Sequence, residues 1–175
     1  MLDFSNSKIL IVGDVMLDKY YFGKVDRISP EAPVPIVNIQ KEESRLGGAS
    51  NVANNIVSLG GHSLLCGVIG HDLFGKEIER ISRHKNIDTF LLKTSSPTIT
   101  KARIIGGKQQ IVRVDYEDKS ELNADNKKLF RDTISRILPE YDILVISDYG
   151  KGLISEDLCR YLIKLAHKYD KKVII

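Results

Sequence analysis

Two aspartates, Asp14 and Asp18, follow the aliphatic run Lys8–Gly13 (KILIVG), while Asp148 and Lys151 follow a second aliphatic run that ends at residue 147. In open α/β sheets, ligands bind outside the carboxyl ends of the parallel strands. Carboxylates at such a place can accept hydrogen bonds from ligand hydroxyls, and an ammonium group can pair with an anion. We therefore expect these four side chains to belong to a binding site at one edge of a sheet.

Three cations lie on two β-branched stretches, 98–105 and 110–114, which a glycine pair separates and which we predict to form a hairpin. Lys101 and Arg103 are two positions apart and therefore share one face of their strand. With Arg113 they could bind a phosphate, because a guanidinium offers a two-pronged donor to its oxygens. A solvated strand face explains the same pattern, so both interpretations stay open on these residues.

The segment 47–51 (GGASN) opens a predicted helix with two adjacent glycines. Such glycines let a ligand approach the backbone closely, and the first turn of a helix offers unpaired N–H groups. A sugar hydroxyl or a phosphate could dock there. The glycines could equally serve only the turn.

The segment 70–76 (GHDLFGK) matches part of a P-loop, the glycine-rich phosphate cradle of many nucleotide-binding proteins. Glu77 stands where a P-loop needs the hydroxyl that holds Mg²⁺, and its carboxylate would repel phosphates. We favour an ordinary strand-to-helix turn. No G-x-G-x-x-G motif follows the first strand, so a dinucleotide-binding fold is unsupported as well.

The run 27–35 (RISPEAPVP) has three prolines within six positions and carries one cation, Arg27, and one anion, Glu31. Prolines restrict the backbone and reduce the entropy lost when a loop is fixed. This composition suits a lid that closes over a ligand, although an ordinary surface loop has the same features.

Strand-like and helix-like segments alternate along most of the chain. In the first helix, Val52, Ile56 and Leu59 share a face. Repeated strand-helix units predict a doubly wound, mostly parallel α/β sheet. We expect strands at Lys8–Gly13, Leu64–Ile69 and Asp142–Ser147, and helices at Asn51–Gly60, around Phe74–Ile81, at Asp125–Leu138 and from a Ser155 cap onward.

Residues 14–46 lack a helical period and carry two strand-like stretches, Tyr20–Phe22 and Val34–Ile39, around the proline-rich run. They predict a small β lid that projects from the main layer. Since a small two-sided sheet cannot bury itself, we expect a homodimer through this lid. The final residues, KKVII, begin another buried strand, and we therefore expect the chain to be the N-terminal part of a longer domain.

The composition limits the class of partner. Among 175 residues, 26 Lys and Arg are interleaved with 23 Asp and Glu, which disfavours a nucleic-acid surface. No apolar run reaches the roughly 18 residues of a membrane helix, and the N-terminus lacks a signal-peptide pattern. Cys66 and Cys159 lie in apolar runs, which predicts buried free thiols and a cytoplasmic location.

Seven motifs follow one another along the chain: GDVMLD (13–18), RISPEAPVP (27–35), LGGASNVANNIVSLG (46–60), GHDLFG (70–75), TITKARI (98–104), QQIVRVD (109–115) and SDYGKG (147–152). This order resembles the ribokinase-like (PfkB) carbohydrate kinases. More narrowly, it resembles the kinase domain of the bifunctional heptose-7-phosphate kinase and heptose-1-phosphate adenylyltransferase family. The RISPEAPVP lid and the QQ-x-x-R-x-D strand separate that family from ribokinase.

The resemblance implies an ATP- and Mg²⁺-dependent kinase acting on a sugar-phosphate substrate, without nucleic-acid or membrane partners. It implies no metal ligand in these residues and a general-base Asp in a later G-A-G-D segment beyond Ile175, together with an ATP-binding part and an adenylyltransferase domain outside this chain. Another sugar kinase and a non-catalytic carbohydrate-binding module stay open as alternatives. The substrate-binding residues expected in this chain are Asp14, Asp18, Arg27, Glu31, Gly47, Gly48, Asn51, Lys101, Arg103, Gln110, Arg113, Asp148 and Lys151.

Overall fold

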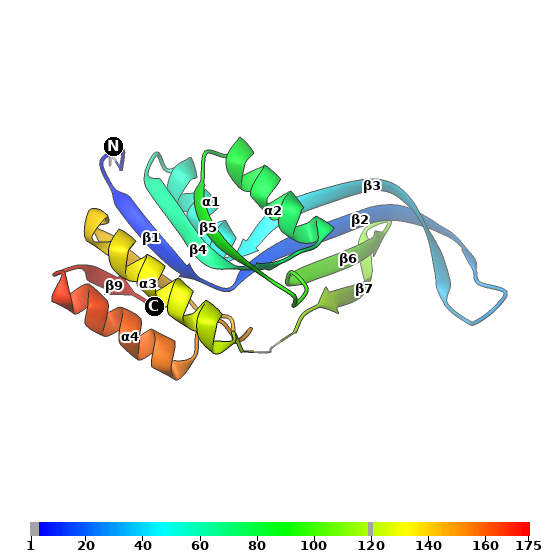
Figure 1. The fold of residues 1–175 in the computed structure, drawn as a ribbon. Helices are drawn as coiled ribbons and strands as arrows, with labels where there is room; N and C mark the ends of the chain where they lie inside the picture. Colours follow the sequence, from blue (N-terminus) through cyan, green and yellow to red (C-terminus); the bar gives the residue numbers. More distant parts are fainter. Residues whose placement is uncertain (1–3, 119–120) are drawn as a thin grey trace.

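The computed structural model describes residues 4–118 and 121–175, which form two sheets joined at Asp14. The main sheet has five strands, all parallel, with helices on both faces (Figure 1). Its strand order is β5 (Asp88–Thr94), β4 (His62–Gly70), β1 (Lys8–Gly13), β8 (Ile143–Ser147) and β9 (Lys172–Ile174). The direction of strand addition reverses between β1 and β8, which is the point where doubly wound sheets bind ligands.

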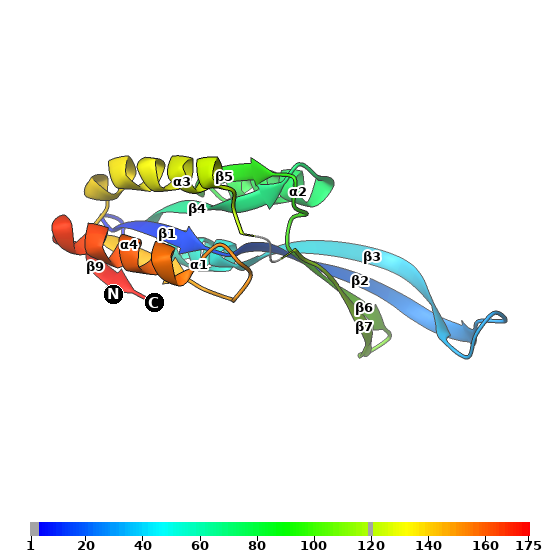
Figure 2. The same cartoon turned by 60° about the horizontal axis from the view of Figure 1, so that its bottom comes forward.

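The second sheet, called the lid sheet below, has four strands and extends away from the helices (Figure 2). Two antiparallel hairpins lie side by side in it, and β2 and β6 run parallel where the hairpins meet. Its strand order is β3 (Pro35–Gly48), β2 (Val15–Ile28), β6 (Thr100–Gly106) and β7 (Gln109–Tyr116).

Alternating side chains of the buried strand β1 build two separate cores. Leu10 and Val12 pack into a cluster with α3 (Ala124–Ile137) and α4 (Glu156–Lys168). Ile11 packs into a second cluster with α1 (Ala49–Ser58) and α2 (Leu73–His84) on the opposite face. This arrangement explains why the strand reads as a continuous aliphatic run: both of its faces are covered.

The predicted doubly wound sheet with a β lid is confirmed, and so is the hairpin at β6 and β7. The predicted cap of α4 is also confirmed, because the Ser155 hydroxyl oxygen accepts a hydrogen bond from Leu158 N at 3.2 Å. Both cysteines are free thiols, as expected. Cys66 is fully buried, and burial raises the pKa of its thiol to about 12.

Four details of the sequence analysis need correction. Strand β5 was not predicted, and the strands of the lid are much longer than the short stretches expected within 14–46. The lid sheet also includes β6 and β7. Leu59 is 65% exposed because α1 ends at Ser58, whereas Val52 and Ile56 pack against the core as predicted, beside the fully buried Ala49 and Ala53.

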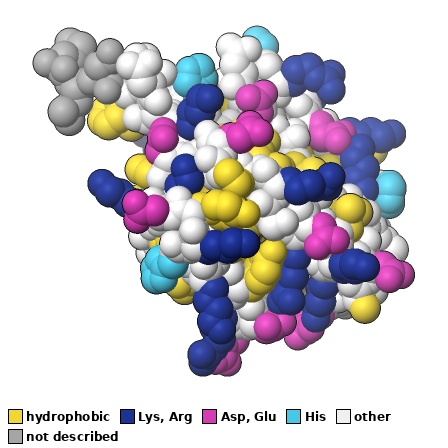
Figure 3. All heavy atoms as spheres, turned by 60° about the vertical axis from the view of Figure 1, so that its left-hand side comes forward, with side chains coloured by type: hydrophobic (Ala, Val, Ile, Leu, Met, Phe, Trp, Pro, Cys, Tyr) yellow, Lys and Arg dark blue, Asp and Glu magenta, His cyan; other side chains and the backbone are white. Residues whose placement is uncertain are grey.

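Charges of both signs alternate on the surface, as they do in the sequence. The face in Figure 3 shows Lys and Arg side chains interspersed with Asp and Glu, without a continuous basic stripe. Within the described ranges, no helix is long and apolar enough to cross a membrane.

The turn at 70–75 is closed by a carboxylate and does not cradle phosphate. Asp72 caps α2 by accepting a hydrogen bond from Gly75 N at 2.8 Å, and it accepts two more from Thr98 N and Oγ1, both at 2.7 Å. Partial burial raises the pKa of the Asp72 carboxyl, but the donors of Thr98 and Gly75 outweigh this effect and the net pKa is lowered. The ionised carboxylate therefore ties α2 to the segment that leads into β6.

We predict that Asp72→Ala lowers the free energy of unfolding by about 1–2 kcal/mol at neutral pH, the usual cost of losing a helix cap. Because the folded-state pKa is lowered, the stabilisation is complete above the ordinary carboxyl pKa of about 4 and is lost as the pH falls through the lowered value. Urea denaturation between neutral and acidic pH measures the difference. Asp125→Ala, which removes a first-turn carboxylate that is not the cap of α3, serves as the control and should cost less.

Candidate functional site

A cavity of about 710 Å³ lies between the lid sheet and the start of α1. Its wall comes from strands β2, β3 and β6, from helices α1 and α2, and from the loop after β8. This cavity is called the lid cavity below. Six of the predicted binding residues line it: Asp18, Gly47, Gly48, Asn51, Lys101 and Arg103.

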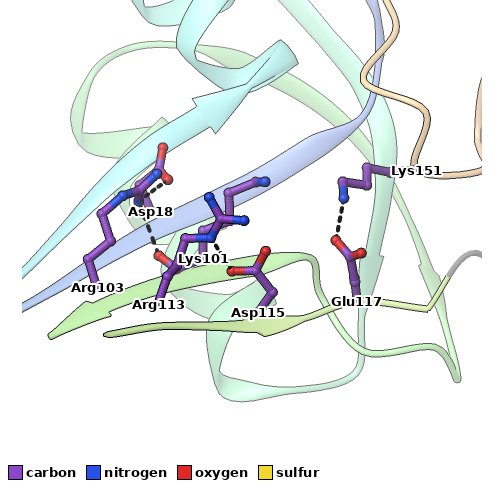
Figure 4. Close-up of polar contacts among 7 residues, drawn as sticks. All are labelled: Asp18, Lys101, Arg103, Arg113, Asp115, Glu117 and Lys151. Carbon is purple, nitrogen blue, oxygen red and sulfur yellow. Dashed lines mark hydrogen bonds and ion pairs between the residues drawn. The ribbon is translucent and has the colours of Figure 1, made fainter. Parts of the chain in front are cut away.

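An ion pair links the two hairpins at the floor of this cavity. Arg103 Nη1 donates to Asp18 Oδ1 at 2.6 Å, and both side chains are about one-fifth exposed (Figure 4). Partial burial lowers the pKa of the Arg103 guanidinium, but its hydrogen bond to Asp18 and the nearby negative charge outweigh this and raise the pKa overall. The second oxygen of Asp18 lies against Gly47, where an added Cβ would be only 2.5 Å away.

Strand register places three cations of the lid cavity, Arg45, Lys101 and Arg103, on one face of the lid sheet. Asp18 pairs with Lys101 across β2 and β6 and with Arg45 across β2 and β3, while Tyr20 pairs with Arg103. Directly paired residues point to the same side of a sheet. The Tyr20 ring consequently has a guanidinium from each neighbouring strand, with Arg45 Cζ at 4.8 Å and Arg103 Cζ at 5.2 Å from its centroid. These are cation–π distances.

The lid cavity carries an excess of positive charge. Four cationic side chains and one carboxylate line it, namely Arg45, Lys85, Lys101, Arg103 and Asp18. In the described part of the chain, Lys101 and Lys85 form no ion pair with a carboxylate. An anionic group with several oxygens therefore finds both guanidinium and ammonium donors in this cavity.

The glycine turn is held against β2 by backbone contacts. Gly48 has a φ of 53°, in the left-handed region that favours glycine, and Ala49 N donates to Asp14 O at 2.9 Å. The Ser50 hydroxyl bonds to Gly47 O at 2.6 Å and to Met16 O at 3.1 Å. This geometry places the beginning of α1, with Asn51, beside Asp18 in the cavity wall.

Asp14 is buried and does not line the lid cavity. It is 1% exposed, and its Oδ2 accepts hydrogen bonds from Tyr149 N at 2.8 Å and Lys151 N at 3.1 Å. Its Oδ1 is buried without a hydrogen-bond partner. Asp14 and Lys151 both line a second cavity of about 550 Å³, and Lys151 forms an ion pair with Glu117 (Figure 4).

The structure does not bring the remaining predicted residues into the lid cavity. Arg113 pairs with Asp115 at 2.8 Å, and Asp148 accepts a hydrogen bond from Gly150 N. Gln110 is exposed at the start of β7. Arg27 and Glu31 lie at the far tip of the β2–β3 hairpin (Figure 2).

Sequence reasoning missed Tyr20, Arg45 and Lys85, which line the lid cavity with the predicted residues. Arg45 lies only two positions before the glycine pair, on the same strand as Gly47, and that spacing was an available signal. Tyr20 and Lys85 carried no comparable signal, since an aromatic residue in a strand and a lysine after a helix are common.

The described residues form no cluster of metal ligands. They contain no group of three or more His, Cys, Asp or Glu side chains that could hold a metal. The 70–75 turn, which resembled a phosphate cradle, is filled by the Asp72 carboxylate. What this part of the chain offers is a cavity wall of cationic side chains, one carboxylate and a glycine turn.

Known proteins similar to this chain are carbohydrate kinases. Residues 6–175 match the model of the pfkB family of carbohydrate kinases. A Helicobacter pylori protein named "Bifunctional protein HldE" is 46% identical over 169 residues, covering 95% of this chain and 37% of that protein. A Bordetella bronchiseptica protein named "D-beta-D-heptose 7-phosphate kinase" is 46% identical over 151 residues, covering 86% of this chain and 48% of that protein. The chain thus spans between a third and a half of these relatives.

Solved structures share the fold at lower identity. A putative phosphofructokinase from Staphylococcus aureus superposes with a TM-score of 0.77 at 14% identity, covering 95% of this chain and 51% of that one. A possible 1-phosphofructokinase from Thermotoga maritima gives a TM-score of 0.72 at 23% identity, covering 95% and 52%. At these identities, the likeness establishes the fold alone.

We predict that the two positive-φ glycines Gly48 and Gly60 respond differently to substitution by alanine. At Gly60, a Cβ meets open space, so Gly60→Ala should cost only the roughly 1–2 kcal/mol of a left-handed alanine. At Gly48, the Cβ would also lie 2.4 Å from Asp14 O, which adds an overpacking cost of about 1–3 kcal/mol. Chemical denaturation of the two variants measures the difference, and equal losses would contradict the close contact at Asp14.

Proposed function

The chain belongs to the pfkB family of carbohydrate kinases, and on that basis we propose that its protein phosphorylates D-glycero-D-manno-heptose 7-phosphate. The γ-phosphoryl group of ATP would pass to the anomeric hydroxyl and give heptose 1,7-bisphosphate. The observation that carries this proposal is the lid cavity, in which four cations surround the hydroxyl acceptor Asp18. Such a wall complements a sugar that bears both hydroxyls and a phosphate.

The names of the similar proteins support the choice of sugar. The relatives that are 44–46% identical carry the names of a bifunctional HldE protein and of a heptose 7-phosphate kinase. Because this chain spans only part of their length, the activity of the whole protein is our proposal. We also propose that it acts in the cytoplasm, in the biosynthesis of ADP-heptose for lipopolysaccharide, together with an adenylyltransferase domain.

The residues of this chain have defined tasks in the proposed reaction. Lys101 and Arg103 bind the substrate phosphate, a dianion that a guanidinium and an ammonium group hold together. Asp18 and Asn51 bind sugar hydroxyls, and the absence of side chains at the glycine pair allows the sugar to approach the backbone. Binding both ends of the substrate fixes its orientation for in-line transfer.

The transfer itself depends on groups outside residues 1–175. The kinase family uses ATP, and Mg²⁺ would neutralise phosphate charge when bound. The G-A-G-D segment that supplies the general base in this family is not part of the sequence. We therefore propose that residues 1–175 form the sugar side of the site and are inactive alone.

A homodimer through the lid sheet is part of the proposal. Several apolar side chains near the lid tip are exposed: Val25 (39%), Ile28 (62%), Val34 (51%) and Ile39 (38%). A partner lid would bury them. The tip residues Arg27 and Glu31 lie at the opposite end of the β2–β3 hairpin from Gly47 and Gly48 of the lid cavity, so in a dimer they would act on the partner's site if they contact substrate at all.

A second candidate is a kinase for another sugar phosphate. The cations of the lid cavity recognise phosphate and do not by themselves select a heptose. A panel of sugar phosphates assayed with the full-length protein decides between the candidates, and a higher kcat/KM for a hexose phosphate would favour the second one.

We predict that Arg103→Ala in the full-length protein raises the KM for heptose 7-phosphate by about 10- to 100-fold, the usual effect of losing a charged hydrogen bond. Arg113→Ala should have a smaller effect, because Arg113 pairs with Asp115 outside the cavity. Arg160→Ala, which removes an exposed ion pair on α4, is the control. Equal losses for Arg103→Ala and Arg160→Ala would contradict the placement of the phosphate.

We predict that the full-length protein is a dimer in light-scattering chromatography and that Ile28→Asp combined with Val34→Asp shifts it towards the monomer. A charge at each position would be buried without a partner in the interface. Leu73→Asp is the matched control, since Leu73 is 77% exposed on α2, outside the lid sheet. A wild-type monomer, or a variant that stays dimeric, would refute a lid-mediated dimer.

A further inference from the structure

Asp18 and Arg103, which we propose to contact opposite ends of a sugar phosphate, form an ion pair with each other. Asp18, the proposed acceptor for sugar hydroxyls, accepts a hydrogen bond at Oδ1 from Arg103 Nη1 at 2.6 Å. Arg103 is also the proposed ligand of the phosphate. While this ion pair is formed, each of these side chains reduces the capacity of the other for substrate.

The ion pair is confined on both sides. On the Asp18 side, Oδ2 lies over Gly47, whose position leaves no space for a Cβ. On the Arg103 side, Nη1 also contacts Lys101 O at 3.4 Å, and the guanidinium lies 5.2 Å from the Tyr20 centroid. With each side chain only about one-fifth exposed, water competes weakly for the pair.

A cation without a partner lies next to this pair. Lys101 is directly opposite Asp18 in the β2–β6 register and lines the same cavity. In the described residues it forms no ion pair. A phosphate that approaches Lys101 thus arrives beside Arg103 with two negative charges, whereas Asp18 offers Arg103 only one.

We infer that the phosphate of the substrate displaces Asp18 from Arg103 and thereby frees the carboxylate to bind the sugar. This inference rests on the proposed function and adds a mechanism of specificity to it. An unphosphorylated sugar must compete with Arg103 for Asp18, whereas a sugar phosphate supplies Arg103 with a stronger partner. Recognition of the two ends of the substrate is therefore positively coupled, and Tyr20 is a positioning residue that keeps the guanidinium near both of its partners.

The test uses the full-length protein and supplies the sugar and the phosphate as two separate ligands. Isothermal titration measures the Kd of unphosphorylated D-glycero-D-manno-heptose with and without saturating inorganic phosphate. We expect phosphate to tighten heptose binding by about 5- to 50-fold, within the usual range of coupling between two sites. Heptose should tighten phosphate binding by the same factor, because such coupling is reciprocal.

Two variants separate this coupling from simple phosphate binding. Arg103→Met should weaken heptose 7-phosphate binding but bind unphosphorylated heptose more tightly than the wild type does, without a response to phosphate. Asp18→Asn should bind inorganic phosphate more tightly than the wild type, because Arg103 has lost its competing carboxylate. Arg160→Met, which breaks an exposed arginine–carboxylate pair, should leave all of these affinities unchanged. If Arg103→Met does not fold, the phosphate affinity of Asp18→Asn alone decides whether Asp18 competes with phosphate for Arg103.

The outcomes distinguish this inference from the proposed function. If heptose 7-phosphate binds but phosphate leaves the Kd of heptose unchanged, and Asp18→Asn does not gain phosphate affinity, the coupling is refuted while the function stands. If another sugar phosphate binds in place of heptose 7-phosphate, the assigned substrate is wrong, and the same two-piece titration with that sugar judges the coupling. If no sugar phosphate binds, both proposals fail.

Discussion

The buried carboxylate of Asp14 holds together the segments from which the site is built. The backbone N–H of Asp14 donates to Ser147 O, and the backbone carbonyl of Asp14 accepts from Ala49 N. The carboxylate oxygen Oδ2 accepts from Tyr149 N and Lys151 N. One residue at the reversal point of the main sheet thus fixes the end of β8, the start of α1 and the loop before α4. Since β1 continues into β2 through this residue alone, it also sets the direction in which the lid sheet leaves the body.

The lid cavity follows from this anchor and from one strand pairing. Asp18 and Arg103 are 85 residues apart in the chain, and the parallel register of β2 with β6 brings them into contact. The antiparallel register of β2 with β3 then places Gly47 under Asp18 and Arg45 beside it. Most of the lid-cavity wall is therefore a property of three adjacent strands, to which α1, the end of α2 and the loop after β8 add further residues.

Local patterns in the sequence were sufficient for most of the main sheet, but not for β5, and for part of the site. Aliphatic runs and helical periods depend on neighbours a few positions away, which explains why β1, β4, β8 and the four helices were recognised. The shared face of Lys101 and Arg103 also follows from a two-residue period. The contact of Asp18 with Arg103 and the position of Tyr20 between two guanidiniums depend on pairing between distant strands, which no local period encodes. Arg113 lies on the predicted strand, but it does not line the lid cavity. It forms an ion pair with Asp115, two residues along the same strand.

The length of the lid hairpin has a mechanical consequence. Strands β2 and β3 have 14 residues each, so the hairpin is roughly 45 Å long at about 3.3 Å per residue. The lid sheet meets the body next to Asp14, and the hairpin, which pairs with β6 only from Leu17 to Gly23, would act as a lever arm if the sheet turned there. A rotation of about 5° at this attachment would move the far end by about 4 Å, on the basis of that length. Small adjustments around the Asp14 carboxylate are thus amplified into displacements of atomic size at the proline-rich tip.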